Sequence, residues 1–117
     1  MTEGLYRVSF HYQNPNNGLP DPGGFEIGVL YFKDGLLKGG SGNYYYSGNY
    51  SLDGTQFTAQ LAVRPIAAHP ATKTPFGPKG TDLAITGTSD HVGIRCGATL
   101  SHLPGDRVQI GLARLVD

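Results

Sequence analysis

The chain has 117 residues, with nine basic and nine acidic side chains, 18 glycines and eight prolines. Balanced charge without a run of either sign argues against a nucleic-acid or membrane-surface binder, and no apolar stretch approaches the ~20 residues of a membrane-spanning helix. The length fits a single domain over residues 1–117. One cysteine and an N-terminus that runs directly into a strand-like pattern predict a cytoplasmic protein.

Apolar and polar residues alternate through most of the chain, which is the pattern of half-buried β-strands. In chain order we predict strands over residues 4–13, 24–33, 36–41, 43–51, 56–64, 81–89, 92–102 and 107–115. Asp34-Gly35 and Asp53-Gly54 are hairpin signals, and residues 89–91 and 103–106 mark further reversals. Glycines near the middles of strands favour strongly coiled strands: Gly28, Gly48, Gly87, Gly97 and Gly111. The prediction is an all-β fold, an eight-stranded antiparallel up-and-down barrel or half-barrel.

The interior of such a barrel is either filled by side chains or holds one small ligand. A two-residue turn at Asp53-Gly54 would pair Tyr50 with Phe57 and Tyr46 with Leu61, and would point both tyrosines inward. Buried phenols need hydrogen-bond partners, which suits a small cavity for an apolar ligand, although a filled core explains the same residues. The predicted lining is Tyr6, Val8, Phe10, Tyr12, Tyr44, Tyr46, Tyr50, Phe57, Leu61, Leu83, Ile85, Ile94, Leu100, Val108, Ile110 and Leu112.

The strand predicted over residues 24–33 carries apolar residues on both faces. One face holds Phe25, Ile27, Val29 and Tyr31, and the other holds Leu30 and Phe32, with Leu37 opposite Phe32 across the hairpin. We expect the face of Leu30, Phe32 and Leu37 to lie outside, covered by a protein partner or by a second copy in a homodimer. An exposed patch without a partner, or the opposite orientation of the strand, are the alternatives.

Two long connections, residues 14–23 and 65–80, are predicted to share one end of the barrel. A structureless connection of about 15 residues is uncommon and often serves as a lid or binding loop. A proline-stiffened surface excursion explains the same sequence.

Catalytic and metal-binding patterns do not emerge. The four histidines show no spacing typical of metal ligands, and Cys96 alternates with core residues, which predicts a buried thiol. The segment GGSGN lacks the helix and the GK[ST] signature of a phosphate loop. We therefore predict no enzymatic activity, no catalytic residue, no metal and no cofactor.

Three segments, GLYRVSF, IGVLYFKDGLLKGGSGNYYYSGNYSLDGTQFTAQLAVR and LAITGT, resemble the GrlR-like family of negative regulators of type III secretion. The resemblance is clearest over residues 4–64. Its elements are Gly28-Val29-Leu30, Asp34-Gly35, Gly39-Gly40, Tyr46 to Tyr50, and Phe57 to Arg64. It implies a lipocalin-like barrel that dimerises, binds a transcriptional activator rather than DNA, and has a cavity able to hold a lipid-like molecule.

The chain departs from the family pattern at two places. Ser41 follows the glycine pair, where the family often has aspartate, and the turn after the tyrosine strand holds one acid, Asp53, where a family regulator carries an acidic cluster for its partner. Only Asp53 is carried over as a partner-binding residue. We expect a cytoplasmic regulatory module that binds a protein partner. The alternative is a barrel that binds a lipid-like or amphiphilic small molecule and has no regulatory partner.

Overall fold

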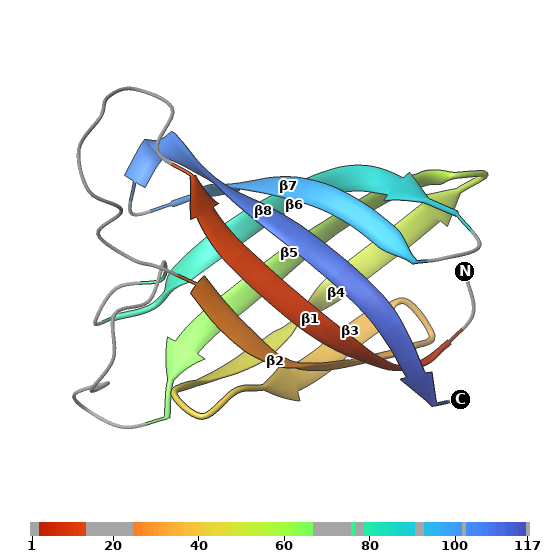
Figure 1. The fold of residues 1–117 in the computed structure, drawn as a ribbon, viewed down its shortest axis with the longest axis horizontal. Coiled ribbons are helices and arrows are strands. Elements are labelled where there is room, and N and C mark those ends of the chain that lie inside the picture. Colours follow the sequence, from red (N-terminus) through yellow and green to blue (C-terminus); the bar gives the residue numbers. More distant parts are fainter. Residues whose placement is uncertain are drawn as a thin grey trace.

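A computed structural model of the chain describes residues 3–13, 25–66, 76, 79–90, 93–101 and 103–116. The strands are β1 (Gly4–Gln13), β2 (Phe25–Lys33), β3 (Leu36–Gly40), β4 (Tyr44–Asp53), β5 (Gln56–Pro65), β6 (Thr81–Ser89), β7 (Ile94–Leu100) and β8 (Leu103–Val116). Each strand pairs antiparallel with the next, and β1 pairs with β8, which closes the barrel (Figure 1). The all-β up-and-down barrel is therefore confirmed, in its closed form.

Element bounds agree with the sequence prediction to within a few residues. The largest difference is at β8, which begins at Leu103 because β7 and β8 already pair at Leu100 and Leu103. The segment 103–106, predicted as a turn, is therefore part of a strand. No α-helix occurs within the described ranges. In that part of the chain, correspondingly, no helix is long and apolar enough to cross a membrane.

The two hairpins predicted from Asp-Gly pairs use different turns. In the β2–β3 hairpin, Lys33 pairs with Leu36, and Asp34 and Gly35 both have positive φ (54° and 78°), which is the type I′ arrangement. In the β4–β5 hairpin, Asp53 pairs with Gln56, so the central residues are Gly54-Thr55.

Gly54, with φ of 64°, takes the first central position, where a type II′ turn needs a residue of positive φ. The predicted pairing of Tyr50 with Phe57 is therefore wrong: Tyr50 faces Ala59, and Tyr46 faces Val63. Because the shift is two residues, every side chain of β4 keeps its predicted face.

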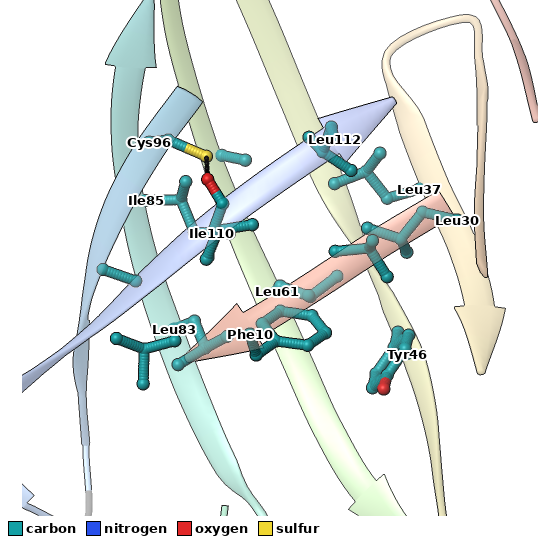
Figure 2. Close-up of a cluster of buried hydrophobic side chains, with 14 of the residues drawn as sticks. Phe10, Leu30, Leu37, Tyr46, Leu61, Leu83, Ile85, Cys96, Ile110 and Leu112 are labelled. Carbon is teal, nitrogen blue, oxygen red and sulfur yellow. Dashed lines mark hydrogen bonds between the residues drawn. The ribbon is translucent and has the colours of Figure 1, made fainter. Parts of the chain in front are cut away.

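All eight strands contribute buried side chains to one hydrophobic core inside the barrel. Aliphatic side chains from β5 to β8 meet aromatic side chains from β1 to β4, as the close-up of this cluster shows (Figure 2). Ring contacts link the neighbouring strands β1 and β2, with centroids 4.9 Å apart for Tyr6 and Phe32. Others cross the interior from β1 to β4, with centroids 5.4 Å apart for Phe10 and Tyr46. At Gly48 an added Cβ would lie 1.9 Å from the carbonyl oxygen of Gln60, so β4 and β5 approach closely there because the residue has no side chain.

The orientation of β2 is opposite to the prediction. Leu30, Phe32 and Leu37 are 2%, 0% and 1% exposed, so they belong to the core and offer no outer surface to a partner or a second copy. The physical reason is the pairing of β2 with β1. β2 pairs with β1 through Tyr6–Leu30 and Val8–Gly28, and paired residues share a face of the sheet. The buried face of β1 therefore fixes the even-numbered residues of β2 inside the barrel.

Candidate functional site

The outer face of β2 carries three large apolar side chains in a row. Ile27, Val29 and Tyr31 are 43%, 39% and 43% exposed, and they alternate with the buried residues of the same strand. We call these three residues the apolar strip. Isolated apolar residues on a surface are ordinary, but an aligned group of them marks a contact site.

The strands beside the apolar strip enlarge it and place cations along it. On the β1 side Arg7 pairs with Val29 and half-buried Leu5 pairs with Tyr31. On the β3 side Lys38 pairs with Tyr31, and Val29 lies opposite Gly40. Gly40 in turn lies opposite half-exposed Tyr45 of β4, so no side chain separates Val29 from that ring. The outward positions of β1, β2 and β3 include no acidic residue. The combined surface is apolar along its centre and basic along both sides.

A second candidate site lies inside the barrel. Phe76 belongs to the connection between β5 and β6 and is completely buried. Its ring packs edge-on against Phe10 and Tyr44, with centroid distances of 4.8 Å and 5.2 Å, and it lies 6.3 Å from the ring of Tyr46. We call Phe10, Tyr44, Tyr46 and Phe76 the aromatic cluster. The cluster lies inside the barrel, beside the C-terminal part of β1 and the N-terminal part of β4.

A carboxylate borders the aromatic cluster. Glu26 pairs directly with Phe10 and, at 7% exposed, points into the barrel beside that ring. Its Oε2 atom accepts a hydrogen bond from Ser41 Oγ at 2.5 Å. Ser41 Oγ also accepts hydrogen bonds from the backbone N–H groups of Asn43 and Tyr44, so the β3–β4 turn holds the serine hydroxyl in position. One hydroxyl donor satisfies only part of the hydrogen-bonding capacity of a buried carboxylate.

The hydroxyl of Tyr46 is buried next to this carboxylate. Tyr46 is 2% exposed, and its Oη atom has no hydrogen-bond partner of ordinary geometry among the described residues. Burial raises the pKa of Tyr46 far above its usual value; the negative charge of Glu26 and the neighbouring Tyr44 act in the same direction, and the nearby Ser41 hydroxyl opposes them. In Figure 2 this oxygen lies on the side of the ring away from Leu30 and Leu37. The phenol is therefore neutral.

The predicted lining residues all point inward. Fifteen of the sixteen predicted lining residues are buried, and Tyr50 is half-buried near the β2–β3 turn, with its ring 4.9 Å from that of Phe32. Those fifteen are Tyr6, Val8, Phe10, Tyr12, Tyr44, Tyr46, Phe57, Leu61, Leu83, Ile85, Ile94, Leu100, Val108, Ile110 and Leu112. Phe10, Tyr44 and Leu83 have no accessible surface, so no water-sized void borders these three side chains.

The remaining predicted features are Asp53 and the two long connections, of which only Phe76 belongs to the aromatic cluster or the apolar strip. Asp53 is exposed at the end of β4, beside the Gly54-Thr55 turn. Most of the two long connections, residues 14–23 and 67–75, lies outside the described residues. The outer surface carries shallow hollows, and one of about 360 Å³ lies over β6, β7 and β8, lined by Thr86, Arg95, Arg107 and Gln109, among others. Within the described residues no group of three or more potential metal ligands comes together.

Sequence reasoning missed Glu26, Ser41 and Phe76 as parts of one site. Glu26 is in phase with Leu30 and Phe32, so the correct orientation of β2 would have placed it inside. Phe76 is the single aromatic residue of the connection between β5 and β6, which is the signal that a loop anchors in a core.

Comparisons with known proteins add no family to this description. The chain matches none of the protein-family models with which it was compared, and no curated protein matches it either.

Proposed function

We propose that the protein is a binding module that acts on a protein partner through the apolar strip and the basic residues beside it. One observation carries the proposal: β2 presents Ile27, Val29 and Tyr31 outward although its other face already supplies the core. Large exposed apolar side chains in a row are not needed to close a barrel, and they suit a contact with another apolar surface.

The charges beside the apolar strip indicate the partner's chemistry. Arg7 and Lys38 flank the strip on neighbouring strands, and Lys33 follows it on β2. A partner with acidic side chains around an apolar centre would complement this surface and would associate faster at low salt. Two copies of this chain that met face to face through the strip would bring like charges together. A different protein therefore fits the strip better than the homodimer expected from the resemblance.

The regulatory role belongs to the same proposal. The resemblance to negative regulators of type III secretion supports a module that acts by occupying a transcriptional activator, and the strip supplies a surface for such a contact. Asp53, the residue carried over from that resemblance, is exposed and available for a second contact.

Site-specific photo-crosslinking in the host cell tests the proposal. A photoreactive phenylalanine analogue replaces Tyr31 on the strip, and the matched control places it at Thr86, which is exposed on the outer face of β6. We expect a crosslink from position 31 to one protein, absent from position 86. With that protein purified, Val29→Glu should weaken binding at least tenfold and Thr86→Glu should leave it unchanged, because only the first buries an unpaired charge in the contact.

Equal crosslinking from both positions, or unchanged affinity of the Val29→Glu variant, would refute a partner surface on β2. Charge reversal at Arg7 separates the two parts of the proposal. Arg7→Glu should reduce the affinity and its salt dependence if the partner is acidic, and should strengthen binding if the partner is basic.

The alternative function, small-molecule binding inside the barrel, has less support because the predicted lining side chains are almost all buried in one core. The end that holds Glu26 and the aromatic cluster differs from the rest because a carboxyl group is buried there beside the rings.

A further inference from the structure

Glu26 is a buried carboxyl group that has no cationic partner among the described residues. Among the described residues the one ion pair is on the outer surface, between Arg64 and Asp82 (2.8 Å), and Glu26 has only the Ser41 hydroxyl as a partner. An ionised carboxylate that leaves water without a cation is strongly disfavoured. A cation bound at this position would find a carboxyl group that the fold already buries.

The surroundings of Glu26 are suited to an organic cation rather than a metal ion. Phe10, directly opposite Glu26, is one of several rings at this end, and aromatic faces attract alkylated ammonium groups. A metal ion would need several hard oxygen or nitrogen ligands, and the described residues offer one carboxylate here. The Tyr46 hydroxyl is buried near Ser41 and has no hydrogen bond of ordinary geometry to any described residue, so it can accept one from an ammonium N–H.

The ring of Phe76 packs against the ring of Phe10, which lies directly opposite Glu26. It is the one member of the aromatic cluster that does not belong to a strand of the barrel wall, and it contacts the other three. A trialkylammonium head is similar in bulk to a phenyl ring, so exchange of the two would leave the barrel wall unchanged. When a buried aromatic-sized volume is vacated in a packed core, the cavity can bind a small apolar molecule.

We propose that this end of the barrel interior is a binding site for a small alkylammonium ion that retains an N–H group. The ion takes the place of the Phe76 ring, sets its charge against Glu26 and donates its N–H to the Glu26 carboxylate or to the Tyr46 hydroxyl. The site lies on the inner side of the sheet and does not depend on the partner surface proposed for the outer face of β2.

The test uses the complete chain and three probes of nearly the same shape. Trimethylammonium has one N–H and a charge, tetramethylammonium has the charge alone, and tert-butanol is neutral. Binding is measured by calorimetry and by NMR shifts of the Tyr46 ring. In the Phe76→Ala variant we expect trimethylammonium to bind at least tenfold more tightly than in the native protein, and more tightly than either other probe.

Adding Glu26→Gln to Phe76→Ala should lower the affinity for trimethylammonium at least tenfold and leave the affinity for tert-butanol unchanged. Adding Tyr46→Phe to Phe76→Ala should reduce the difference in affinity between trimethylammonium and tetramethylammonium. If Phe76→Ala does not fold, Phe76→Leu vacates less volume and should show the same order of probes. The proposal is overturned if tert-butanol binds as tightly as trimethylammonium, or if Glu26→Gln leaves the affinity for trimethylammonium unchanged.

Discussion

The outer faces of β2 and β6 differ although both strands are built in the same way. Each strand alternates, and each turns apolar residues into the core. Outside, β6 presents Asp82, Ala84, Thr86 and Thr88, small or polar residues that suit contact with water. On β2 the corresponding positions form the apolar strip. The face of β6 shows what closure of this barrel requires of an outer surface, so the strip on β2 is an addition that folding does not explain.

The largest expected effect separates the two faces of β2. Phe32→Ala removes a fully buried ring that contacts Tyr6, Tyr50 and Phe57, and should lower the free energy of unfolding by about 3–5 kcal/mol. Tyr31→Thr, one residue away on the strip, should cost no more than about 1 kcal/mol, because threonine retains strand propensity. Urea denaturation of both variants measures the difference. A comparable loss at Tyr31 would mean that the outer face is structural.

A second prediction concerns the effect of pH on stability through Cys96, a buried residue of β7 that pairs with Gly87 of β6. Burial raises the pKa of the Cys96 thiol from 9.0 to about 12, and its Sγ atom lies 3.8 Å from the carbonyl oxygen of Ile110 (Figure 2). The unfolded chain releases the thiol proton from pH 9 upward while the folded chain keeps it. The stability that this thiol contributes is therefore complete below pH 9 and declines as the pH rises towards 12.

Comparison with Cys96→Ala isolates this contribution, since alanine does not titrate and the tyrosines are common to both proteins. The difference in unfolding free energy between native protein and variant should shift by roughly 1.4 kcal/mol per pH unit above pH 9, in favour of the variant. Denaturation curves at pH 8, 9, 10 and 11 provide the measurement. A difference that stays constant with pH would contradict a thiol kept neutral by the core.

The smallest expected effect comes from exchanging the character of the two outer faces. Val29→Thr and Thr86→Val are nearly equal in volume and lie at exposed positions of β2 and β6. Each should change the free energy of unfolding by no more than about 0.5 kcal/mol. Retention on a hydrophobic-interaction column should fall for Val29→Thr and rise for Thr86→Val. Equal retention of native protein and Val29→Thr would mean that the strip is not an accessible apolar surface.

Strand order and the inward faces were predictable from sequence because one period dominates each strand. Alternation places Tyr44 and Tyr46 inside whatever the exact turn, since a shift of two residues preserves the face. The register of β4 and β5 was not predictable from Asp53-Gly54 alone, because the glycine fits the second central position of one turn type and the first of another.

The orientation of β2 and the site around Glu26 depend on long-range pairing. Both faces of β2 are apolar, and only its pairing with β1 decides which is buried. Phe76 reaches the core from the connection between β5 and β6, and no periodicity predicts where a loop residue inserts. The candidate sites thus depend on contacts between segments far apart in the chain, while the barrel follows from local pattern.

Closure of the barrel also limits how a partner can attach. Because β1 and β8 complete the ring of paired strands, no strand of the described barrel is a free edge with an unpaired side along its whole length. Capture by strand addition, in which an extended peptide pairs with an edge strand, is therefore disfavoured for the folded protein. A partner must then be recognised through side-chain contacts, so single substitutions on the outer face of β2 should alter the choice of partner without altering the fold.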